Sequence, residues 1–236
     1  MREARERRRE LFLARMSKDA MAAYEHPYRD WDDDEKELLP LFLSLVGSSK
    51  QILDLAGGYA KAAPHLLQDG NSVVLGDLSL HSLRGGREAV ASNDVQFVRL
   101  NMIVELPFVD GAFDGIWFSE AFEYVPPDVR VRFFRSLRRI VKKGGVVFLN
   151  AEGLSDECTR FTYLKNYLYW KLVKREPVVW GEYIYMLNVP DYKGWHYHSL
   201  VLGREIEKCF RAAGFEVLKS KNRGKKEYSA YVLRSL

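Results

Sequence analysis

The sequence predicts an α/β fold: a seven-stranded, mostly parallel sheet with helices on both faces and an antiparallel hairpin at its C-terminal end. Short apolar runs alternate with helix-length amphipathic segments over residues 50–150, and strands joined by helical crossovers run parallel. Two further strand-like runs near the C-terminus are joined by a short polar link, so they pair antiparallel. The 236 residues suffice for one large domain with a substantial core.

Each predicted strand is a short apolar run bounded by turn-forming residues. The strands are expected at 51–55, 72–76, 95–100, 113–119, 146–150, 215–219 and 228–233. Helical periodicity predicts the crossover and flanking helices at 61–68, 80–92, 127–141 and 202–213. Gly214 closes the last of these helices at the position where glycine commonly ends a helix.

Residues 1–46 are expected to form a helical cap that precedes the main domain of residues 47–236. Residues 1–22 predict a helix with arginines at its start and an apolar stripe behind them. An irregular aromatic and acidic link is expected at 24–36. A second helix follows at 37–46, where Pro40 is tolerable because it falls in the first turn.

Residues 152–200 interrupt the alternation and predict an insertion on the substrate side of the main domain. This stretch is rich in tyrosine and tryptophan, and only a helix at 161–174 is indicated within it. Its aromatic side chains could form the core of a small subdomain or contact a substrate. We favour substrate contact for some of them, because aromatic side chains commonly line small-molecule pockets.

Composition excludes several classes of protein. No apolar run is long enough to span a bilayer, and the charged N-terminus lacks the apolar core of a secretory signal. The two cysteines, Cys158 and Cys209, have no metal-ligand spacing and cannot form a disulfide framework, so a cytoplasmic location is expected. A formal net charge of +4 permits an anionic partner without requiring one, and no oligomeric state is indicated.

Three segments at the carboxyl ends of successive strands predict a ligand pocket, because open parallel sheets bind ligands at that edge. The small residues of 54–60 allow close backbone approach, and the helix behind them offers amides to an anion. Asp77, 19 residues beyond Gly58, can accept both hydroxyls of a ribose. Asn101 can pair with the amino group and a ring nitrogen of adenine. Together they favour an adenosine that carries a charged tail.

Five segments, in the correct order, resemble motifs of the class I S-adenosylmethionine-dependent methyltransferases, which implies a Rossmann-like sheet. The resemblance covers about residues 50–150 and 202–235 and is closest to the ubiquinone and menaquinone biosynthesis type. The segments are ILDLAGGYA, VVLGDLS, FVRLNMIVELPFVDGAFDGIWFSEAFEYVPP, LRRIVKKGGVVFLN and REIEKCFRAAGFEV.

The resemblance implies S-adenosylmethionine as the cofactor and assigns a role to each matching residue. The methionine and ribose part would contact Asp54, Ala56, Gly57 and Gly58. The ribose hydroxyls would meet Asp77 beside Leu78, and the adenine would meet Asn101 and the backbone amide of Met102. Ser119 would face the reactive methyl group beside Glu120, and Tyr28 with Tyr24 would fold over the site as a lid.

Four positions depart from the family pattern. Two of the three glycines of the first motif are Ala56 and Ala60, and alanine resists a positive φ. The acid usual after the third strand is Asn101, and Lys143 stands where proline is usual. If the first loop requires left-handed backbone at its alanines, cofactor affinity is expected to suffer.

Methyl transfer from a sulfonium is an in-line displacement, for which positioning alone can supply effective molarities of about 10⁵–10⁸ M. Aromatic faces near the sulfonium would stabilise its charge. An oxygen or nitrogen acceptor also needs a base, for which the candidates are Glu120, Glu123, His196 and His198. The two histidines share a face if their segment is extended, but no third metal ligand is indicated, so no metal site is expected.

Several alternatives stay open. Asp77 could simply cap the following helix, and Glu120 and Glu123 could be solvated loop acids. The leading function is methylation of a small, partly apolar or aromatic acceptor. The basic N-terminus and the stretch 219–226 also permit an RNA or protein substrate, and the motif alanines permit a non-catalytic cofactor-binding module. A nicotinamide dehydrogenase is disfavoured, because G-x-G-x-x-G does not follow the first strand.

Overall fold

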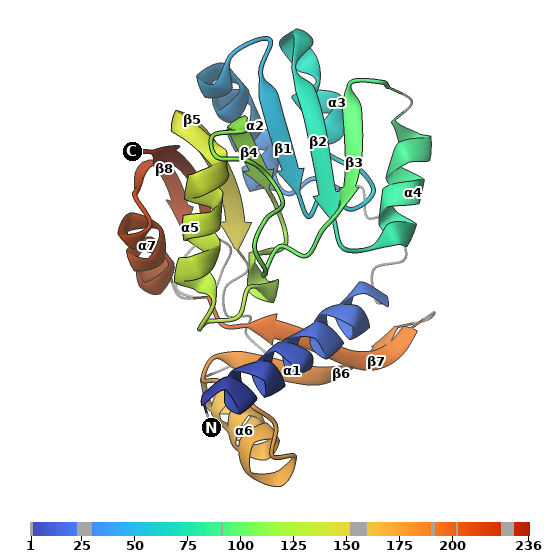
Figure 1. Cartoon of the computed structure of the whole chain (residues 1–236), viewed down its shortest axis with the longest axis vertical. Coiled ribbons are helices and arrows are strands. Elements are labelled where there is room, and N and C mark those ends of the chain that lie inside the picture. Colours follow the sequence, from blue (N-terminus) through green and yellow to red (C-terminus); the bar gives the residue numbers. More distant parts are fainter. Residues whose placement is uncertain are drawn as a thin grey trace.

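The computed structural model describes residues 2–22, 30–90, 92–151, 160–189, 192–201, 203–222 and 229–236. Its centre is a seven-stranded sheet in the order β3-β2-β1-β4-β5-β9-β8 (Figure 1). The strands are β1 (Gln51–Leu55), β2 (Ser72–Asp77), β3 (Val95–Arg99), β4 (Phe113–Phe118), β5 (Val141–Ala151), β8 (Phe215–Asn222) and β9 (Ser229–Ser235).

Strands β1 to β5 run parallel, whereas β9 lies antiparallel between β5 and β8. The predicted sheet and its C-terminal hairpin are therefore confirmed. The parallel strands point their carboxyl ends to one edge, which faces a second layer of the molecule (Figure 1).

Helices cover both faces of the sheet, as predicted. On one face, α5 (Arg130–Ile140) and α7 (Gly203–Ala212) bury apolar side chains against the central strands. The other face is covered by α2 (Asp33–Val46), α3 (Ala63–Leu66) and α4 (Leu80–Ala89). Two single 3-10 turns, η1 (Gln68–Gly70) and η2 (Phe122–Tyr124), lie in the connections.

The expected start of the second helix at residue 37 was wrong, because α2 begins at Asp33. Asp32 caps the helix by accepting from the Glu35 backbone amide at 2.6 Å, and the Glu35 carboxylate accepts in return from the Asp32 amide at 2.9 Å. This reciprocal pair satisfies two donors that a helix start otherwise leaves unpaired. Pro40 consequently lies inside the helix on an exposed position, not in its first turn.

Other boundaries differ from the expectations as well, most clearly at two places. The helix expected at 61–68 is shortened to α3, and Asp69 adopts a left-handed φ of 58° beyond it. Strand β5 begins at Val141, where a helix was expected to end, because Val141 already pairs with Phe113 before the register shifts. Gly144 lies within that irregular stretch at a φ of 78°, which glycine adopts without steric strain.

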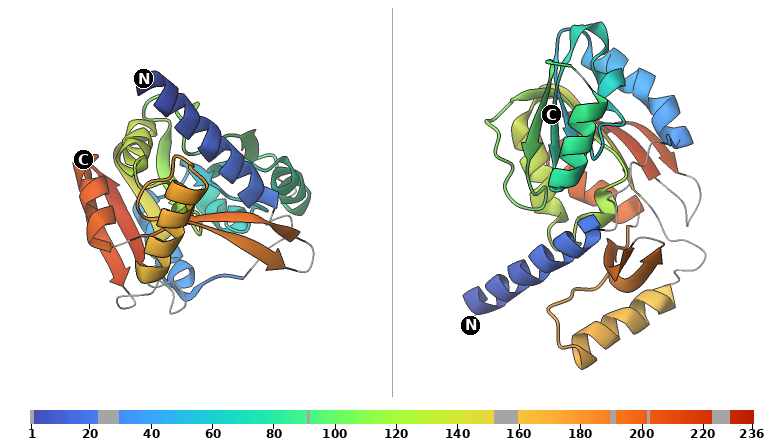
Figure 2. Two further views of the ribbon diagram at one scale, coloured as in Figure 1. Left: turned by 90° about the horizontal axis from the view of Figure 1, so that it is seen from below. Right: turned by 90° about the vertical axis from the view of Figure 1, so that its right-hand side faces the viewer.

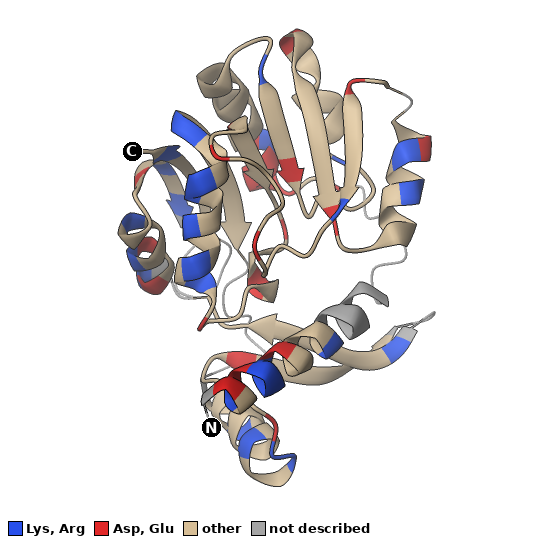
Figure 3. Cartoon of the chain, viewed as in Figure 1, with Lys and Arg blue, Asp and Glu red and all other residues tan. Residues whose placement is uncertain are grey.

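A second layer lies below the carboxyl edge of the sheet (Figures 1 and 2). It contains α1 (Arg2–Ala22), α6 (Arg160–Leu168), the π-helical turn η3 (Tyr169–Val173), and the antiparallel hairpin of β6 (Glu182–Val189) and β7 (Tyr192–Ser199). The sequence pattern did not predict this hairpin. The coloured part of α1 carries charges of both signs (Figure 3).

The two layers share a small apolar core. Phe12, Leu13 and Met16 of α1 pack with Ile184 and Tyr197 of the hairpin, together with Ile103, Val129, Trp170 and Val178. The two helices of residues 1–46 therefore lie apart, since α2 packs on the sheet and α1 on the hairpin. None of the described helices combines the length and apolar character needed to cross a membrane.

Candidate active site

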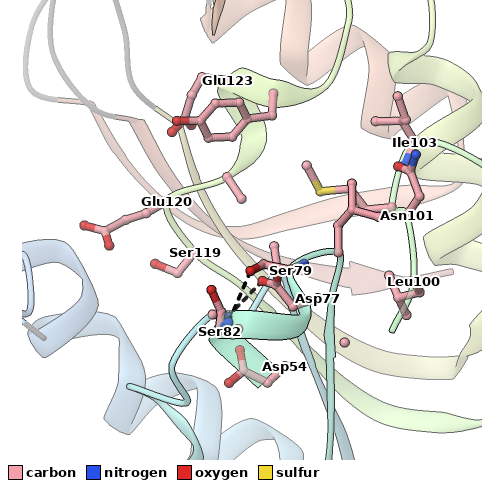
Figure 4. Close-up of a pocket in the computed structure, with 18 of the residues that line it drawn as sticks. Asp54, Asp77, Ser79, Ser82, Leu100, Asn101, Ile103, Ser119, Glu120 and Glu123 are labelled. Atoms are coloured by element: carbon pink, nitrogen blue, oxygen red, sulfur yellow. Dashed lines mark hydrogen bonds between the residues drawn. The ribbon is translucent and has the colours of Figure 1, made fainter. Parts of the chain in front are cut away.

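A cavity of about 400 Å³ lies between the carboxyl edge of the sheet and the second layer. Its polar end is built from the loops that follow β1, β2, β3 and β4 (Figure 4). These loops bring together residues predicted separately from the sequence: Asp54, Ala56, Gly57, Gly58, Asp77, Leu78, Asn101, Met102, Ser119, Glu120 and Glu123.

The loop after β1 requires left-handed backbone at both motif alanines. Ala56 has a φ of 59° and Ala60 a φ of 63°, in a region that side chains with a Cβ disfavour. Gly57 needs to be glycine for a different reason, since a Cβ there would lie 2.7 Å from the Asp54 carboxyl. The loop thus folds tightly against Asp54.

Asp54 at the end of β1 is almost completely buried, with 2% of its surface exposed. Its Oδ2 has no hydrogen-bond partner among the described residues. Burial, together with the neighbouring charge of Asp77, raises the pKa of Asp54 to about 7. A buried carboxyl oxygen that lacks a protein partner in a pocket fits a ligand that donates a hydrogen bond.

Asp77 at the end of β2 is fixed by backbone amides, among them those of Gly58 and Ser79. Gly58 donates to its Oδ2 at 3.0 Å and Ser79 to its Oδ1 at 2.8 Å. Burial nonetheless raises the pKa of this carboxyl above its usual range. The cap of α4 is Ser79, whose hydroxyl accepts from the Ser82 amide at 3.1 Å. Asp77 therefore does not cap the helix itself, and lone pairs of its carboxylate remain for a ligand.

The loop after β3 is held by its own asparagine. The Asn101 Oδ1 accepts from the Ile103 backbone amide at 3.1 Å, which fixes the turn that carries Met102. Met102 packs against both the sheet core and the core of the second layer. This side of the cavity is therefore partly apolar.

The residues after β4 join a buried polar network. Ser119 donates to Glu35, and the Glu120 backbone amide donates to Asn150 at 2.6 Å. The Lys61 ammonium lies between two carboxylates, 2.8 Å from Glu35 and 2.9 Å from Glu120. Burial raises the pKa of Glu120 even though Lys61 opposes that shift.

Sequence reasoning missed three members of this network, Glu35, Lys61 and Asn150. The D-x-x-E pattern at 32–35 is a recognisable capping signal, but it does not say that the capping glutamate faces a pocket. Carboxyl oxygens of Asp32, Glu35 and Glu120 lie within 4.8 Å of one another, as metal ligands would. The Lys61 ammonium already supplies a cation to Glu35 and Glu120 in this group.

His196 and His198 share one face of β7, as expected for an extended segment. Their Nε2 atoms lie 3.1 Å apart, and each lies near the Tyr124 hydroxyl, at 3.4 and 3.3 Å. Burial lowers the pKa of His196 to about 4 and that of His198 to about 3. Both rings are thus neutral at pH 7, and Tyr124 connects them to the cavity that it lines.

The far end of the cavity is apolar and aromatic. Its wall includes side chains from α1, from the loop after β3, from the region of η2 and from β7: Leu13, Met16, Ile103, Tyr124, Pro126 and Tyr197. Part of the expected insertion therefore contributes directly to the cavity. The expected lid residues Tyr24 and Tyr28 lie outside the described residues, as does Cys158, and Cys209 is a free, half-buried thiol.

Comparison with known proteins identifies the fold. Residues 52–145 match a family described as "Methyltransferase domain". The chain is 30% identical over 111 residues to an uncharacterized methyltransferase of Synechocystis sp.. The aligned region is 47% of this chain and 51% of that protein. The chain thus spans about half the length of this curated relative.

Solved structures agree with the family match. A SAM-dependent methyltransferase of Methanosarcina mazei superposes with a TM-score of 0.64 at 21% identity, over 84% of this chain and 97% of that one. An S-adenosylmethionine-dependent methyltransferase of Mesorhizobium loti gives a TM-score of 0.60 at 18% identity, over 85% and 97%.

The seven-stranded sheet, which has a cavity at its carboxyl edge, is the fold that this chain shares with these S-adenosylmethionine-dependent methyltransferases of known structure. Residues 52–145 thus resemble a methyltransferase domain, and S-adenosylmethionine is the cofactor that this match and the fold imply. The ubiquinone-type subgroup stays a prediction.

Proposed function

We propose that this protein is an S-adenosylmethionine-dependent methyltransferase that acts on a small, partly apolar or aromatic acceptor by in-line transfer. The observation that carries the proposal is the two-ended cavity. Its polar end holds Asp54, Asp77 and Asn101, whereas its other end is lined by aliphatic and aromatic side chains. One end suits a nucleoside and the other an apolar acceptor.

The residues of the polar end fit the cofactor. The unpartnered Asp54 oxygen and the anchored Asp77 carboxylate would accept hydrogen bonds from the ribose and its neighbourhood, with Ala56, Gly57 and Gly58 allowing close backbone approach. Leu78, Asn101 and Met102 would surround the adenine, and Ser119 would stand near the methyl end. Tyr28 stays a proposed lid residue.

When bound, S-adenosylmethionine supplies a methyl group on a positively charged sulfur. The apolar wall of the cavity would hold the acceptor beside that end of the pocket. Tyr124 offers an aromatic face that would stabilise positive charge.

Four side chains are proposed to take an acceptor proton. Glu120 and Glu123 line the cavity directly, whereas His196 and His198 would act through Tyr124. Because the Lys61 ammonium holds Glu120, and because burial makes His196 and His198 weak bases, we favour Glu123 for an acceptor at the apolar end.

Titration calorimetry with S-adenosylmethionine, S-adenosylhomocysteine and NAD tests the cofactor assignment directly. We expect binding of the first two and none of NAD. Methyl transfer to a panel of phenols, quinols and apolar amines then tests the acceptor class. Absence of uptake of both sulfur nucleosides would reject the enzyme assignment, and uptake without turnover on any acceptor would support the non-catalytic alternative.

An RNA or protein acceptor is the alternative that the basic segments favour. In the described structure, however, Arg9 and Arg15 of α1 pair with Glu182 and Glu176. These two cations are therefore partly neutralised within the molecule. Salt-sensitive retention of RNA by the purified protein would favour the nucleic-acid alternative over the small-molecule one.

A further inference from the structure

The helical segment of α6 and η3, residues 160–173, has a second apolar face that points to solvent. Phe161, Leu164, Leu168 and Leu172 recur every three or four residues, so they form one stripe. Their exposed fractions are 62%, 40%, 42% and 67%, respectively. Large apolar side chains gathered in this way are uncommon on a protein surface and mark an interaction site.

The opposite face of the same segment fixes it to the hairpin. Tyr163 and Trp170 are buried, and the Trp170 indole donates to the Ile184 carbonyl at 3.2 Å. Asn166 makes two hydrogen bonds with the Ile184 backbone, at 2.7 and 3.0 Å. Among the described contacts, those of the inner face hold the segment to the hairpin, and the exposed stripe contributes little to the fold.

Cations border the exposed stripe. Residues 161–176 contain Lys165, Lys171, Lys174 and Arg175 but a single acid, Glu176, whose carboxylate pairs with Arg15 at 2.8 Å. The Lys171 ammonium donates to the Val178 carbonyl at 3.0 Å, which leaves Lys165, Lys174 and Arg175 beside the stripe. The Lys165 ammonium lies 4.4 Å from the centre of the Phe161 ring, and that of Lys174 lies 5.6 Å from the Tyr169 ring. Each pair combines an exposed aromatic ring with a positive charge.

The stripe also lies at an informative place. α6 forms the end of the molecule farthest from the sheet, in the layer that closes the cavity (Figures 1 and 2), and Figure 3 shows Lys and Arg along it. A flat surface that approached this end of the molecule would contact α6 first. The sheet would lie on the side away from that surface.

We propose that the outer face of α6 and η3 binds the surface of an anionic lipid bilayer. An apolar stripe flanked by lysine and arginine is the pattern of a helix that lies in a membrane interface. The apolar side chains would insert below the headgroups, while the cations would pair with lipid phosphates. A second copy of this chain would also cover apolar surface, but the border of like charges would repel across such an interface.

Vesicle co-sedimentation tests the proposal with the full chain. The unmodified protein should pellet with phosphatidylcholine vesicles that contain about 30% phosphatidylglycerol, and weakly with phosphatidylcholine alone. The double variant Leu168→Asp/Leu172→Asp should lose roughly tenfold or more of its partition coefficient, because it places two carboxylates in the stripe. Lys165→Gln/Lys174→Gln should bind more weakly and with less dependence on salt.

Val109→Asp is the matched control, because Val109 is 76% exposed in the loop before β4, at the opposite edge of the sheet. It should bind vesicles like the unmodified protein. Equal binding by the Leu168→Asp/Leu172→Asp variant, or no binding of the unmodified protein to anionic vesicles, overturns the proposal. The proposal is also overturned if light scattering shows that the unmodified protein is a dimer and that the Leu168→Asp/Leu172→Asp variant is a monomer. The outer face of α6 and η3 would then join two copies of the chain. Calorimetry on the same samples measures S-adenosylhomocysteine binding. Because that binding does not depend on vesicles, it tests the proposed enzyme activity separately from membrane binding.

Discussion

The Asp77 carboxylate accepts the backbone amide of Gly58 at 3.0 Å, which ties the end of β2 to the glycine loop after β1. This contact orients one carboxylate oxygen inside the loop, and the Ser79 amide holds the other. The side chain is therefore preorganised in the pocket before any ligand arrives, and preorganisation lowers the entropy lost on binding.

Asp77→Ala should weaken binding of S-adenosylhomocysteine by roughly 10- to 100-fold, since a hydrogen bond to a charged group contributes about 1.5–3 kcal/mol. Titration calorimetry measures the change. Asp110→Ala is a suitable control, because Asp110 is an exposed partner of Arg139 and does not line the cavity. The affinity of this variant for S-adenosylhomocysteine should not change. Unchanged affinity in Asp77→Ala would contradict the ribose assignment.

Ala56 and Ala60 both have a positive φ, and we expect relief of this backbone strain to change the free energy of unfolding. Ala56→Gly should raise the free energy of unfolding by about 0.5–1 kcal/mol, because glycine adopts the φ of 59° without the penalty of about 1–2 kcal/mol that a Cβ brings. The gain is reduced by the greater freedom of glycine in the unfolded chain. Urea denaturation provides the measurement.

Ala60→Gly is the matched comparison. Its φ is similar, 63°, but Ala60 is only 2% exposed, and its methyl group belongs to the core beside α4. Loss of that buried methyl should offset the relief of strain, so stability should change little. A larger gain for Ala60→Gly than for Ala56→Gly would show that backbone strain is not the governing factor.

Most of the sheet could be predicted from the sequence because each strand carries its own local signal. A buried parallel strand is a short apolar run between turns, and residues such as Ile52 and Leu53 have that environment wherever the rest of the chain lies. The glycine loop and Asp77 were predictable for the same reason, since their positions follow directly from strand ends.

The hairpin and the polar network could not be predicted this way, because their partners are remote in sequence. Ile184 and Tyr197 become core residues only when Phe12 of α1 packs on them. Lys61 meets its two carboxylates across 26 and 59 residues. Such contacts follow from tertiary packing, which no local periodicity encodes.

Asp54 should make stability depend on pH. Its pKa is about 7 in the folded protein and near 4 in an unfolded chain, so between these values the folded state binds more protons. Stability must then fall as the pH rises from about 4 to about 7. Asp54→Asn should remove this contribution and be more stable than the unmodified protein at pH 8, by up to about 4 kcal/mol.

Chemical denaturation of both proteins at several pH values measures the difference. The two curves should converge at about pH 3 and below, where Asp54 is protonated in both the folded and the unfolded state. A difference that is constant with pH would mean that the asparagine alters packing and that the Asp54 carboxyl does not titrate as described.

The attachment of α1 gives the last prediction. The Arg9 guanidinium donates to Glu182 at 2.9 Å and to Asp128 at 2.8 Å, and Tyr197 also donates to Glu182 at 2.8 Å. The Glu182 side chain is only 1% exposed, so Arg9→Met would leave a buried carboxylate without its cation. Breaking such a pair typically costs about 3–5 kcal/mol.

We expect this loss to appear as local opening of α1 and the hairpin, because both lie outside the sheet core. Hydrogen exchange of β6 and β7 should accelerate in Arg9→Met, whereas that of β1 and β4 should change much less. Arg15→Ala removes the more exposed pair with Glu176 and should cost less than about 1 kcal/mol. If the two variants exchange alike, Arg9 does not anchor the helix. The double variant Arg9→Met/Glu182→Leu should recover much of the protection, because it replaces the buried ion pair by apolar side chains.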